Sequence, residues 1–351
     1  MSKLDDATVL ITGGTGSLGQ TLVRRLLTGA LGMPKRVIVF SRDEAKHYAM
    51  KTSWKHMEAA TDDVYYGNFD ELIEFWVGDV RDPHDVEAVV SHADVVFHAA
   101  ALKQVPSCEY FPGQAVATNV TGAENVVRAA RRSARTHTVV GVSTDKACKP
   151  INVMGMTKAL QERIITEGNL PLEGGCRMFA VRYGNVLESR GSVIPLFRQQ
   201  IANGGPVTLT LPEMTRFLLS LDSAVDTIFA AYREARPGEI FVPRVPSARI
   251  TDIARAMIGE REIETVVTGI RPGEKLHEIL VSEEEVFRTT ERAGHYVIQS
   301  ALPELQEAGA ARVLDGEYSS AGALVEGQEL GRLLAQESFA DRAVAGTPNL
   351  S

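Results

Sequence analysis

The chain has 351 residues, of which 44% are hydrophobic and 23% charged, and its formal net charge is -8. These values are typical of a folded, water-soluble protein and exclude a chain that is disordered throughout. The acidic surplus argues against general nucleic-acid binding, which needs clustered Lys and Arg. No apolar run approaches the roughly 20 residues that cross a bilayer, so we expect no membrane partner.

The three cysteines, Cys108, Cys148 and Cys176, show no Cys-x-x-Cys spacing. Neither a disulfide framework nor a cysteine zinc site is expected, and the histidines offer no metal-ligand spacing, so we predict no metal site. The first residues lack the hydrophobic core of a signal peptide. These features favour a reduced, cytoplasmic setting.

Strands and helices are predicted to alternate through the first half of the chain. Residues 8–11 form an apolar, β-favouring run that ends in glycines, and residues 20–27 have the apolar spacing of a helix. Further strands are predicted at residues 36–40, 75–77, 93–101 (with an exit loop) and 139–143. This order implies an α/β fold with a Rossmann-type doubly wound parallel sheet, whose ligands bind beyond the carboxyl ends of the strands.

The composition divides the chain into three parts. Residues 1–184 carry the β-α-β pattern and are predicted to form the dinucleotide-binding domain, with some later segments returning to it. Residues 185–320 have shorter elements and more Pro and Gly, as expected of a smaller substrate-binding lobe. Residues 321–351 are predicted to be a partly disordered tail with one weak helix around residues 330–334. Residues 52–72 lack a clear period and are interpreted as an insertion between the second and third strands.

The glycines after the first strand predict a loop that binds dinucleotide phosphates. Their spacing permits a tight turn, close approach of the backbone to a pyrophosphate, and close packing of helix on strand. A glycine-rich turn that binds nothing has the same composition, but the position between a strand and a helix favours binding. The residues expected to contact the cofactor here are Gly13, Thr15, Gly16, Ser17, Leu18 and Gly19.

The end of the second predicted strand bears on the choice of dinucleotide. NAD-selective sites commonly have Asp or Glu at this position, which bonds the ribose hydroxyls. Here the position holds Ser41 and Arg42, whose hydroxyl and guanidinium suit a phosphate, although Arg42 could merely cap a solvated face. We therefore predict NADP rather than NAD, with Asp79 and Val80 near the adenine.

Groups that can transfer protons follow the strand predicted at residues 139–143. Thr144, Asp145 and Lys146 come directly after it, and Lys158 follows soon afterwards. A carboxylate beside an amine can supply an acid and a base, although the same pair on a protein surface is an ordinary ion pair.

Taken in order, these motifs resemble the extended short-chain dehydrogenase/reductases and, within them, the UDP-N-acetylglucosamine 4,6-dehydratases of capsule and flagellin-sugar pathways. The resemblance covers most of the chain. Each motif is weak alone, but the ordered series is specific. It comprises the glycine loop and residues 41–44 (SRDE), 78–82 (GDVRD), 98–103 (HAAALK), 143–146 (STDK), 181–186 (VRYGNV), 214–217 (MTRF) and 271–275 (RPGEK).

The resemblance implies oxidation at carbon 4 of the sugar, elimination of water across carbons 5 and 6, and return of the stored hydride to carbon 6. The product would be a UDP-2-acetamido-4-keto-6-deoxyhexose, and the tightly bound NADP would be recycled. By resemblance, Asp145 is the candidate acid, Lys146 the candidate base and Thr144 the hydrogen-bonding hydroxyl. Lys146 would have to lose its proton near neutral pH, through desolvation or a neighbouring cation such as Lys158.

One residue departs from the usual short-chain dehydrogenase pattern. Met154 stands four residues before Lys158, where a catalytic tyrosine is normal. Met154 cannot transfer a proton and could simply pack against apolar neighbours. Asp145, Lys146 or a bound water must then take the proton of the 4-hydroxyl group, while Lys158 can still bond the nicotinamide ribose.

The resemblance also assigns residues to the two ligands. Ala99 and Ala100 would lie near the cofactor, and His98 would shape the nicotinamide-side loop. Guanidinium groups suit a diphosphate because their planar fork binds two oxygens at once. The residues predicted to bind the UDP-sugar are Lys103, Asn185, Arg190, Arg216, Arg271 and Glu274.

Two alternative functions stay open. A UDP-sugar 4-epimerase would make the same ketone and return the hydride to the opposite face of carbon 4. A non-catalytic NADP-binding regulatory protein would explain Met154 but not the retained acid and amines. The family also suggests a homo-oligomer, whereas the stereochemistry at carbon 5, the preferred UDP-sugar and the pathway are not encoded in these motifs.

Overall fold

A computed structural model describes residues 4–60, 69–170, 175–186, 192–307, 309, 311–322 and 324–342. The chain forms two compact units. Unit 1 comprises Met1–Tyr183, Asp222–Arg244 and Leu280–Glu317, and unit 2 comprises Gly184–Leu221, Val245–Ile279 and Tyr318–Ser351. The chain therefore leaves unit 1 and re-enters it twice.

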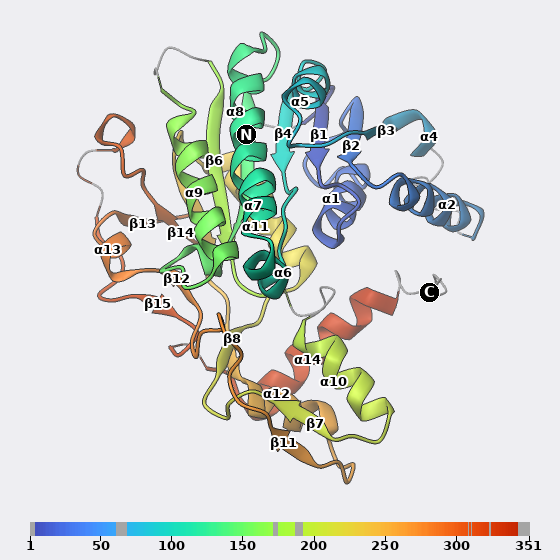
Figure 1. Cartoon of the computed structure of the whole chain (residues 1–351), viewed down its shortest axis with the longest axis vertical. Coiled ribbons are helices and arrows are strands. Elements are labelled where there is room, and N and C mark those ends of the chain that lie inside the picture. The colour runs from blue at the N-terminus through green and yellow to red at the C-terminus, as the bar shows by residue number, and fades with distance from the viewer. Residues whose placement is uncertain are drawn as a thin grey trace. The chain divides into compact units, whose positions relative to one another are not determined.

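Unit 1 is built, within the described residues, on a nine-stranded sheet with the order β13-β14-β9-β6-β5-β4-β1-β2-β3 (Figure 1). From β3 to β9 the neighbouring strands are parallel, whereas β14 and β13 add an antiparallel edge. This is a Rossmann-type α/β fold, as the sequence predicts. The strands are β1 (Thr8–Thr12), β2 (Arg36–Ser41), β3 (Ile73–Val77), β4 (Val95–His98), β5 (Thr138–Thr144), β6 (Arg177–Tyr183), β9 (Ile240–Pro243), β13 (Thr289–Arg292) and β14 (His295–Ile298).

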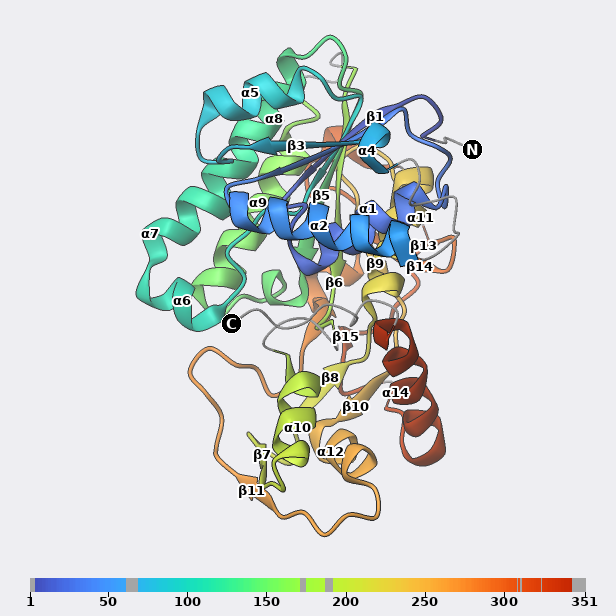
Figure 2. The ribbon, with the colours of Figure 1, turned by 90° about the vertical axis from the view of Figure 1, so that its right-hand side faces the viewer.

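Helices cover both faces of this sheet (Figure 2). Because the central strands are covered on both sides, they are nearly continuous apolar runs, and every residue of β1 is buried. On one face α5 (Pro83–Val90) packs against α8 (Gly122–Arg132), which packs against α9 (Val153–Glu167). On the other face α1 (Ser17–Leu27) is joined to α11 (Leu221–Glu234) by ion pairs from Arg24 and Arg25.

Further elements complete unit 1. They are α2 (Glu44–Ala60), α4 (Phe69–Leu72), α6 (Val105–Tyr110), α7 (Pro112–Ala115), the π-helical segment η1 (Val116–Thr121), the 3-10 turns η2 (Asp145–Ala147) and η3 (Pro303–Leu305), and α13 (Glu283–Val286). The end of α2 and the whole of α4 occupy the described part of the region interpreted as an insertion, and residues 61–68 lie outside the described residues.

Unit 2 has a small core of its own. In the described part of this unit, antiparallel β8 and β10 and parallel β7 and β11 accompany three helices. Their bounds are α10 (Val193–Ala202), β7 (Val207–Leu209), β8 (Thr215–Phe217), β10 (Ser247–Arg249), α12 (Ile250–Ile258), β11 (Thr265–Val267) and α14 (Gly327–Arg342), and the chain passes between the units near β12 (Ile279–Val281) and β15 (Tyr318–Ser319). Leu330 on α14 is buried in this core, and the weak helix expected around residues 330–334 lies within α14.

The helices within the described ranges include none that is both long enough and apolar enough to span a membrane.

The start of α9 lies directly against the turn that follows β5. The Asn152 side chain caps the helix by accepting a hydrogen bond from the Gly155 amide at 2.8 Å. A Cβ atom on Gly155 would overlap the carbonyl oxygen of Lys146. Glycine at this position therefore lets α9 contact the backbone of η2, which fixes the helix relative to the end of β5.

Substitution of Gly155→Ala should force α9 and η2 apart. We expect a loss of about 1 to 3 kcal/mol of unfolding free energy, the usual cost of overpacking. Gly113→Ala on α7 is the matched control, because a Cβ there meets nothing within 4 Å. Urea unfolding of both variants measures the difference, and equal stability of the two would contradict the packing described.

Candidate active site

The carboxyl end of β5 carries a hydrogen-bonded acid and amine. Thr144 Oγ1 donates to Asp145 Oδ1 at 2.8 Å, and Lys146 Nζ donates to the same oxygen at 3.0 Å. The Asp145 side chain is fully buried, whereas that of Lys146 is 20% exposed. The pair is therefore partly desolvated, unlike an ordinary surface ion pair, and its contact distance is suitable for proton transfer.

Lys158 projects from α9 toward neutral acceptors. Its Nζ donates to the carbonyl oxygen of Val142 at 2.5 Å and to Gln161 Oε1 at 2.6 Å. Burial lowers the pKa of Lys158 to about 7, while the charge of Glu162 acts in the opposite direction. The sequence assigned a proton loss near neutral pH to Lys146; the structure gives Lys158 a pKa in that range. Contact between Lys158 and a nicotinamide ribose stays a prediction.

Met154 stands where a tyrosine is normal, and its side chain packs against apolar neighbours. It is 5% exposed and belongs to a cluster with Cys108 and Ala115, against which Leu102 and Val105 also pack. Its thioether is thus held among hydrocarbon groups and places no proton donor at this position.

His98 is a buried neutral base at the end of β4. Its Nδ1 lies 2.8 Å from Thr12 Oγ1, which joins the ends of β4 and β1. Burial, reinforced by the charge of Lys158, lowers the pKa of His98 to about 3. The ring therefore stays neutral near pH 7, in keeping with a residue that shapes the adjoining loop.

The glycine loop is packed as a dinucleotide cradle requires. Gly13 has a φ of +70°, and a Cβ there would lie 2.8 Å from the backbone of Ala100. Gly19 on α1 packs equally closely, since its Cβ would lie 2.5 Å from the Cα of Gly14. Helix α1 begins at Gly16 without a side-chain cap, so its first amides and the positive end of its dipole suit a phosphate.

Polar side chains meet where β2 and β3 end. Thr15 Oγ1 donates to Ser41 Oγ at 3.1 Å, and Arg42 lies 3.7 Å from Asp79. Asp79 also accepts a hydrogen bond from the Arg81 guanidinium at 2.5 Å. These predicted cofactor residues lie at or just after the carboxyl ends of neighbouring parallel strands, so they share one edge of the sheet. They are the glycine-loop residues through Leu18, and Ser41, Arg42, Asp79, Val80, Ala99 and Ala100.

A buried ion cluster, which the sequence analysis did not find, lies behind the reactive strand end. The Arg182 guanidinium donates to both oxygens of Glu162, at 2.9 and 2.7 Å, and to both oxygens of Glu285, at 2.7 and 2.9 Å. Glu162 also accepts from the Ser143 hydroxyl at 2.6 Å. These four residues, called the Arg182 cluster below, join β5, α9, β6 and α13. The available signal was a charged residue inside the apolar strand that ends at Tyr183.

The residues predicted to bind the UDP-sugar are divided between the units. Lys103 follows β4 in unit 1, whereas Asn185, Arg216, Arg271 and Glu274 belong to unit 2. Arg216 is 7% exposed and donates to the carbonyls of Thr215 and Leu276. The Arg271 amide donates to Glu274 at 3.4 Å, so these two residues share one turn. Arg190 lies outside the described residues, and substrate contact stays a prediction for all of them.

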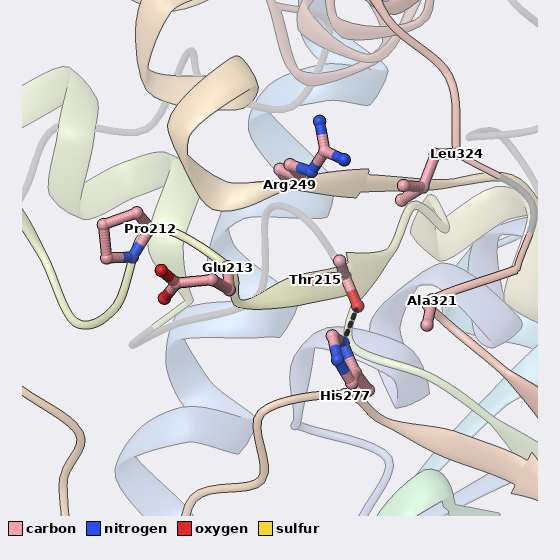
Figure 3. Close-up of a pocket in the computed structure, with 7 residues that line it drawn as sticks. All are labelled: Pro212, Glu213, Thr215, Arg249, His277, Ala321 and Leu324. Atoms are coloured by element: carbon pink, nitrogen blue, oxygen red, sulfur yellow. Dashed lines mark hydrogen bonds between the residues drawn. The ribbon is translucent and has the colours of Figure 1, made fainter.

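Unit 2 also contains a cavity of about 440 Å³ (Figure 3). The Thr215 hydroxyl at its wall is hydrogen-bonded to His277 Nδ1 at 2.9 Å. Successive residues of a strand face opposite sides, which is why Thr215 lines the cavity and its neighbour Arg216 does not. The lining residues are Pro212, Glu213, Thr215, Arg249, His277, Ala321 and Leu324, none of which was predicted to bind substrate.

Replacing Lys158→Met should remove a pH dependence of stability. The pKa of Lys158 is about 7 in the folded chain, against an ordinary value of 10.5 once the side chain is exposed by unfolding. The unfolded chain therefore binds more protons between these values, and stability rises with pH. Relative to the variant, the wild type should gain up to about 1.4 kcal/mol per pH unit from pH 7 to 9. Urea unfolding across this range, with the exposed Lys51→Met as control, measures the gain; parallel curves for wild type and Lys158→Met would refute it.

Replacing Arg182→Met should leave buried Glu162 without the guanidinium that binds both of its oxygens, and should leave Glu285, among the described residues, with only its 3.4 Å ion pair to Arg288. We expect a loss of about 3 to 5 kcal/mol of unfolding free energy. Arg132→Met is the control, because its pair with Glu87 has side chains that are 65% and 50% exposed and should contribute less than about 1 kcal/mol. Equal losses in urea unfolding would show that the Arg182 cluster is energetically unimportant.

Several known proteins are similar to this chain in sequence. The chain is 41% identical over 303 residues to an uncharacterized membrane protein of Methanocaldococcus jannaschii, covering 84% of this chain and 86% of that protein. It is also 41% identical over 298 residues to a UDP-glucose 4-epimerase of Rickettsia typhi, covering 84% and 83%.

Solved structures extend the comparison. Pen from Bacillus thuringiensis superposes with a TM-score of 0.84 at 33% identity, covering 95% of this chain and 100% of that chain. DesIV from Streptomyces venezuelae, a dTDP-glucose 4,6-dehydratase, has a TM-score of 0.62 at 20% identity, covering 77% and 86%, and shows the shared fold. Residues 9–300 match the family model described as polysaccharide biosynthesis protein. The chain belongs to this family of extended short-chain dehydrogenase/reductases, which includes nucleotide-sugar dehydratases and epimerases.

Proposed function

We propose that the protein is an NADP-dependent UDP-N-acetylglucosamine 4,6-dehydratase. The observation that carries this proposal is the buried Asp145 in hydrogen-bond contact with Lys146 at the carboxyl end of β5. An epimerase needs only oxidation and reduction at carbon 4, whereas elimination across carbons 5 and 6 needs an additional acid and base. Asp145 and Lys146 are chemically suited to that extra step.

The residues divide the elimination between them. When bound, a nicotinamide dinucleotide would supply the hydride acceptor for oxidation at carbon 4 and the hydride donor for carbon 6. Lys146 removes the proton of carbon 5, which the new ketone has made acidic. Asp145 protonates the oxygen leaving carbon 6, which departs as water. Lys146 then holds the proton that carbon 5 regains after the hydride has returned.

The number of protons that Asp145 and Lys146 can hold restricts which group can deprotonate the 4-hydroxyl. The elimination requires Asp145 protonated and Lys146 neutral, and we take the pair to hold this one proton before carbon 4 is oxidised. If the pair also took the 4-hydroxyl proton, both members would be protonated and no base would remain. We therefore propose that a bound water takes this proton. Each turnover consumes one proton from Asp145, and the proton from the 4-hydroxyl replaces it.

The cofactor and the two units complete the proposal. A nicotinamide dinucleotide fits the glycine loop, and Ser41 with Arg42 supports NADP over NAD because both offer hydrogen-bond donors to a phosphate. We assign dinucleotide binding to unit 1 and the predicted diphosphate and sugar contacts of Arg216, Arg271 and Glu274 to unit 2. Self-association, which the family suggests, and a cytoplasmic location, which the sequence features suggest, accompany this proposal as expectations.

A second candidate is a UDP-sugar 4-epimerase. It is favoured by the relative named UDP-glucose 4-epimerase, with which this chain shares 41% identity. A non-catalytic regulatory role has less support, because it gives no reason for a buried acid beside an amine.

Mass spectrometry of the purified protein with NADP and UDP-N-acetylglucosamine tests the proposal. We expect a product that has lost one water. Lys146→Ala should lower its rate by about 10² to 10⁴-fold, the usual contribution of an acid or base, while dinucleotide binding persists. Lys51→Ala, an exposed lysine on α2, is the control and should retain turnover. A 4-epimer formed without loss of water would reject the dehydratase in favour of the epimerase.

A further inference from the structure

A histidine that the sequence analysis did not single out lies beside the residues predicted to select the dinucleotide. His47 on α2 is 5% exposed, and its Nε2 lies 2.8 Å from Ser41 Oγ. Thr15 Oγ1 donates to the same Ser41 oxygen at 3.1 Å. The Ser41 hydroxyl is therefore held between the glycine loop and α2.

The surroundings of His47 determine the direction of its hydrogen bond to Ser41. Among the described residues, His47 Nδ1 is buried and has no hydrogen-bond partner. A proton on Nδ1 would be a buried donor with nothing to bond, which native structures rarely tolerate. The hydrogen-bond network thus assigns the proton to Nε2, which donates it to Ser41. Burial also lowers the pKa of His47, against the charges of Asp43 and Glu44, which favours the neutral ring.

This arrangement leaves Ser41 as a donor only. A hydroxyl oxygen has two lone pairs and one proton. His47 and Thr15 occupy both lone pairs, so the Ser41 proton is available to bond a third group. Arg42, whose guanidinium also only donates, follows directly and is 48% exposed. Its neighbour Asp79 is an acceptor, but it is already bonded twice by the Arg81 guanidinium.

A site lined with hydrogen-bond donors can distinguish NADP from NAD. The adenosine ribose of NAD presents a 2′-hydroxyl, which NAD-selective sites bind through an acidic acceptor. The 2′-phosphate of NADP presents only acceptor oxygens and two negative charges. Two donors side by side match the phosphate and leave the 2′-hydroxyl proton without a partner.

We propose that His47 is a positioning residue that sets the preference for NADP, by fixing the Ser41 hydroxyl as a donor toward the 2′-phosphate. This inference rests on the proposed NADP cofactor and extends it to a residue that acts through Ser41. A purely structural role for His47, such as its ring contact with Phe75 at 5.3 Å between centroids, would affect both dinucleotides alike.

Two substitutions separate these roles. His47→Phe keeps a ring against Phe75 but removes the donor, whereas His47→Gln retains an N–H donor. Calorimetric titration should give His47→Phe an about tenfold weaker NADP⁺ affinity, the value of one charge-assisted hydrogen bond, with NAD⁺ affinity unchanged. His47→Gln should restore most of the NADP⁺ affinity. In a Ser41→Ala background, His47→Phe should change the ratio of the two affinities no further.

Several outcomes would overturn the inference. An equal loss of affinity for both dinucleotides in His47→Phe would leave only a structural role. The same conclusion would follow if His47→Phe changed the ratio of the two affinities by the same amount in the Ser41→Ala background as in the wild type. If His47→Phe fails to fold, an unchanged affinity ratio in Ser41→Ala alone refutes the donor argument. A wild type that binds NAD⁺ as tightly as NADP⁺ would reject the cofactor choice and this inference together. The dehydratase proposal would survive that result, because loss of water from the sugar is measured separately.

Discussion

The Arg182 guanidinium, buried between two carboxylates, is the interaction on which the reactive end of the sheet depends. Through Glu162 it holds α9, through Glu285 it holds α13, and through Glu162 and Ser143 it holds the end of β5. A charge removed from water to this extent is stable only with its partners in place. The cluster therefore ties α9, which carries Lys158, to the end of β5, which Asp145 and Lys146 follow directly.

The same cluster influences the chemistry next to it. Burial drives the pKa of Lys158 down and the charge of Glu162 limits the fall, so the protonation of an amine on α9 is linked to the buried ion cluster. Met154, by contrast, brings no titratable group to α9 and packs among apolar side chains. In the proposed dehydratase the elimination would have its own acid and base, whereas the initial oxidation would have no phenol. The proposed acceptor of the 4-hydroxyl proton is a water molecule, because Asp145 and Lys146 are both needed for the elimination.

Features that depend on residues close together in the sequence were predictable from the sequence. The apolar runs predicted β1, β2 and β5, and the glycine spacing predicted the turn into α1, where Gly13 has a positive φ that favours glycine. The acid and amine after β5 are adjacent in sequence, so their contact required no knowledge of the fold. The carboxyl ends of parallel strands then bring Ser41 and Asp79 to the edge that the glycine loop occupies.

Contacts that depend on tertiary packing were not predictable in this way. Glu285 lies 103 residues after Arg182 in the chain. His47 is close to Ser41 in the sequence, but their contact depends on how α2 packs against the end of β2. Neither contact leaves a periodic signal, although a charged residue within an apolar strand was a hint. In the C-terminal region, the weak helical pattern at residues 330–334 falls within α14, which is longer than the pattern indicated because Leu330 gains stability by burial in the core of unit 2. Tertiary packing there outweighed weak local propensity.

The central claim, that this site oxidises carbon 4 in order to eliminate across carbons 5 and 6, can be tested with a labelled substrate. UDP-N-acetylglucosamine carrying deuterium at carbon 4 is converted by the purified protein, and the product is analysed by NMR and mass spectrometry. The account predicts a 4-keto sugar that has lost one water and carries the deuterium at carbon 6. Deuterium that stays on carbon 4, in unchanged substrate or in a 4-epimer, would contradict it.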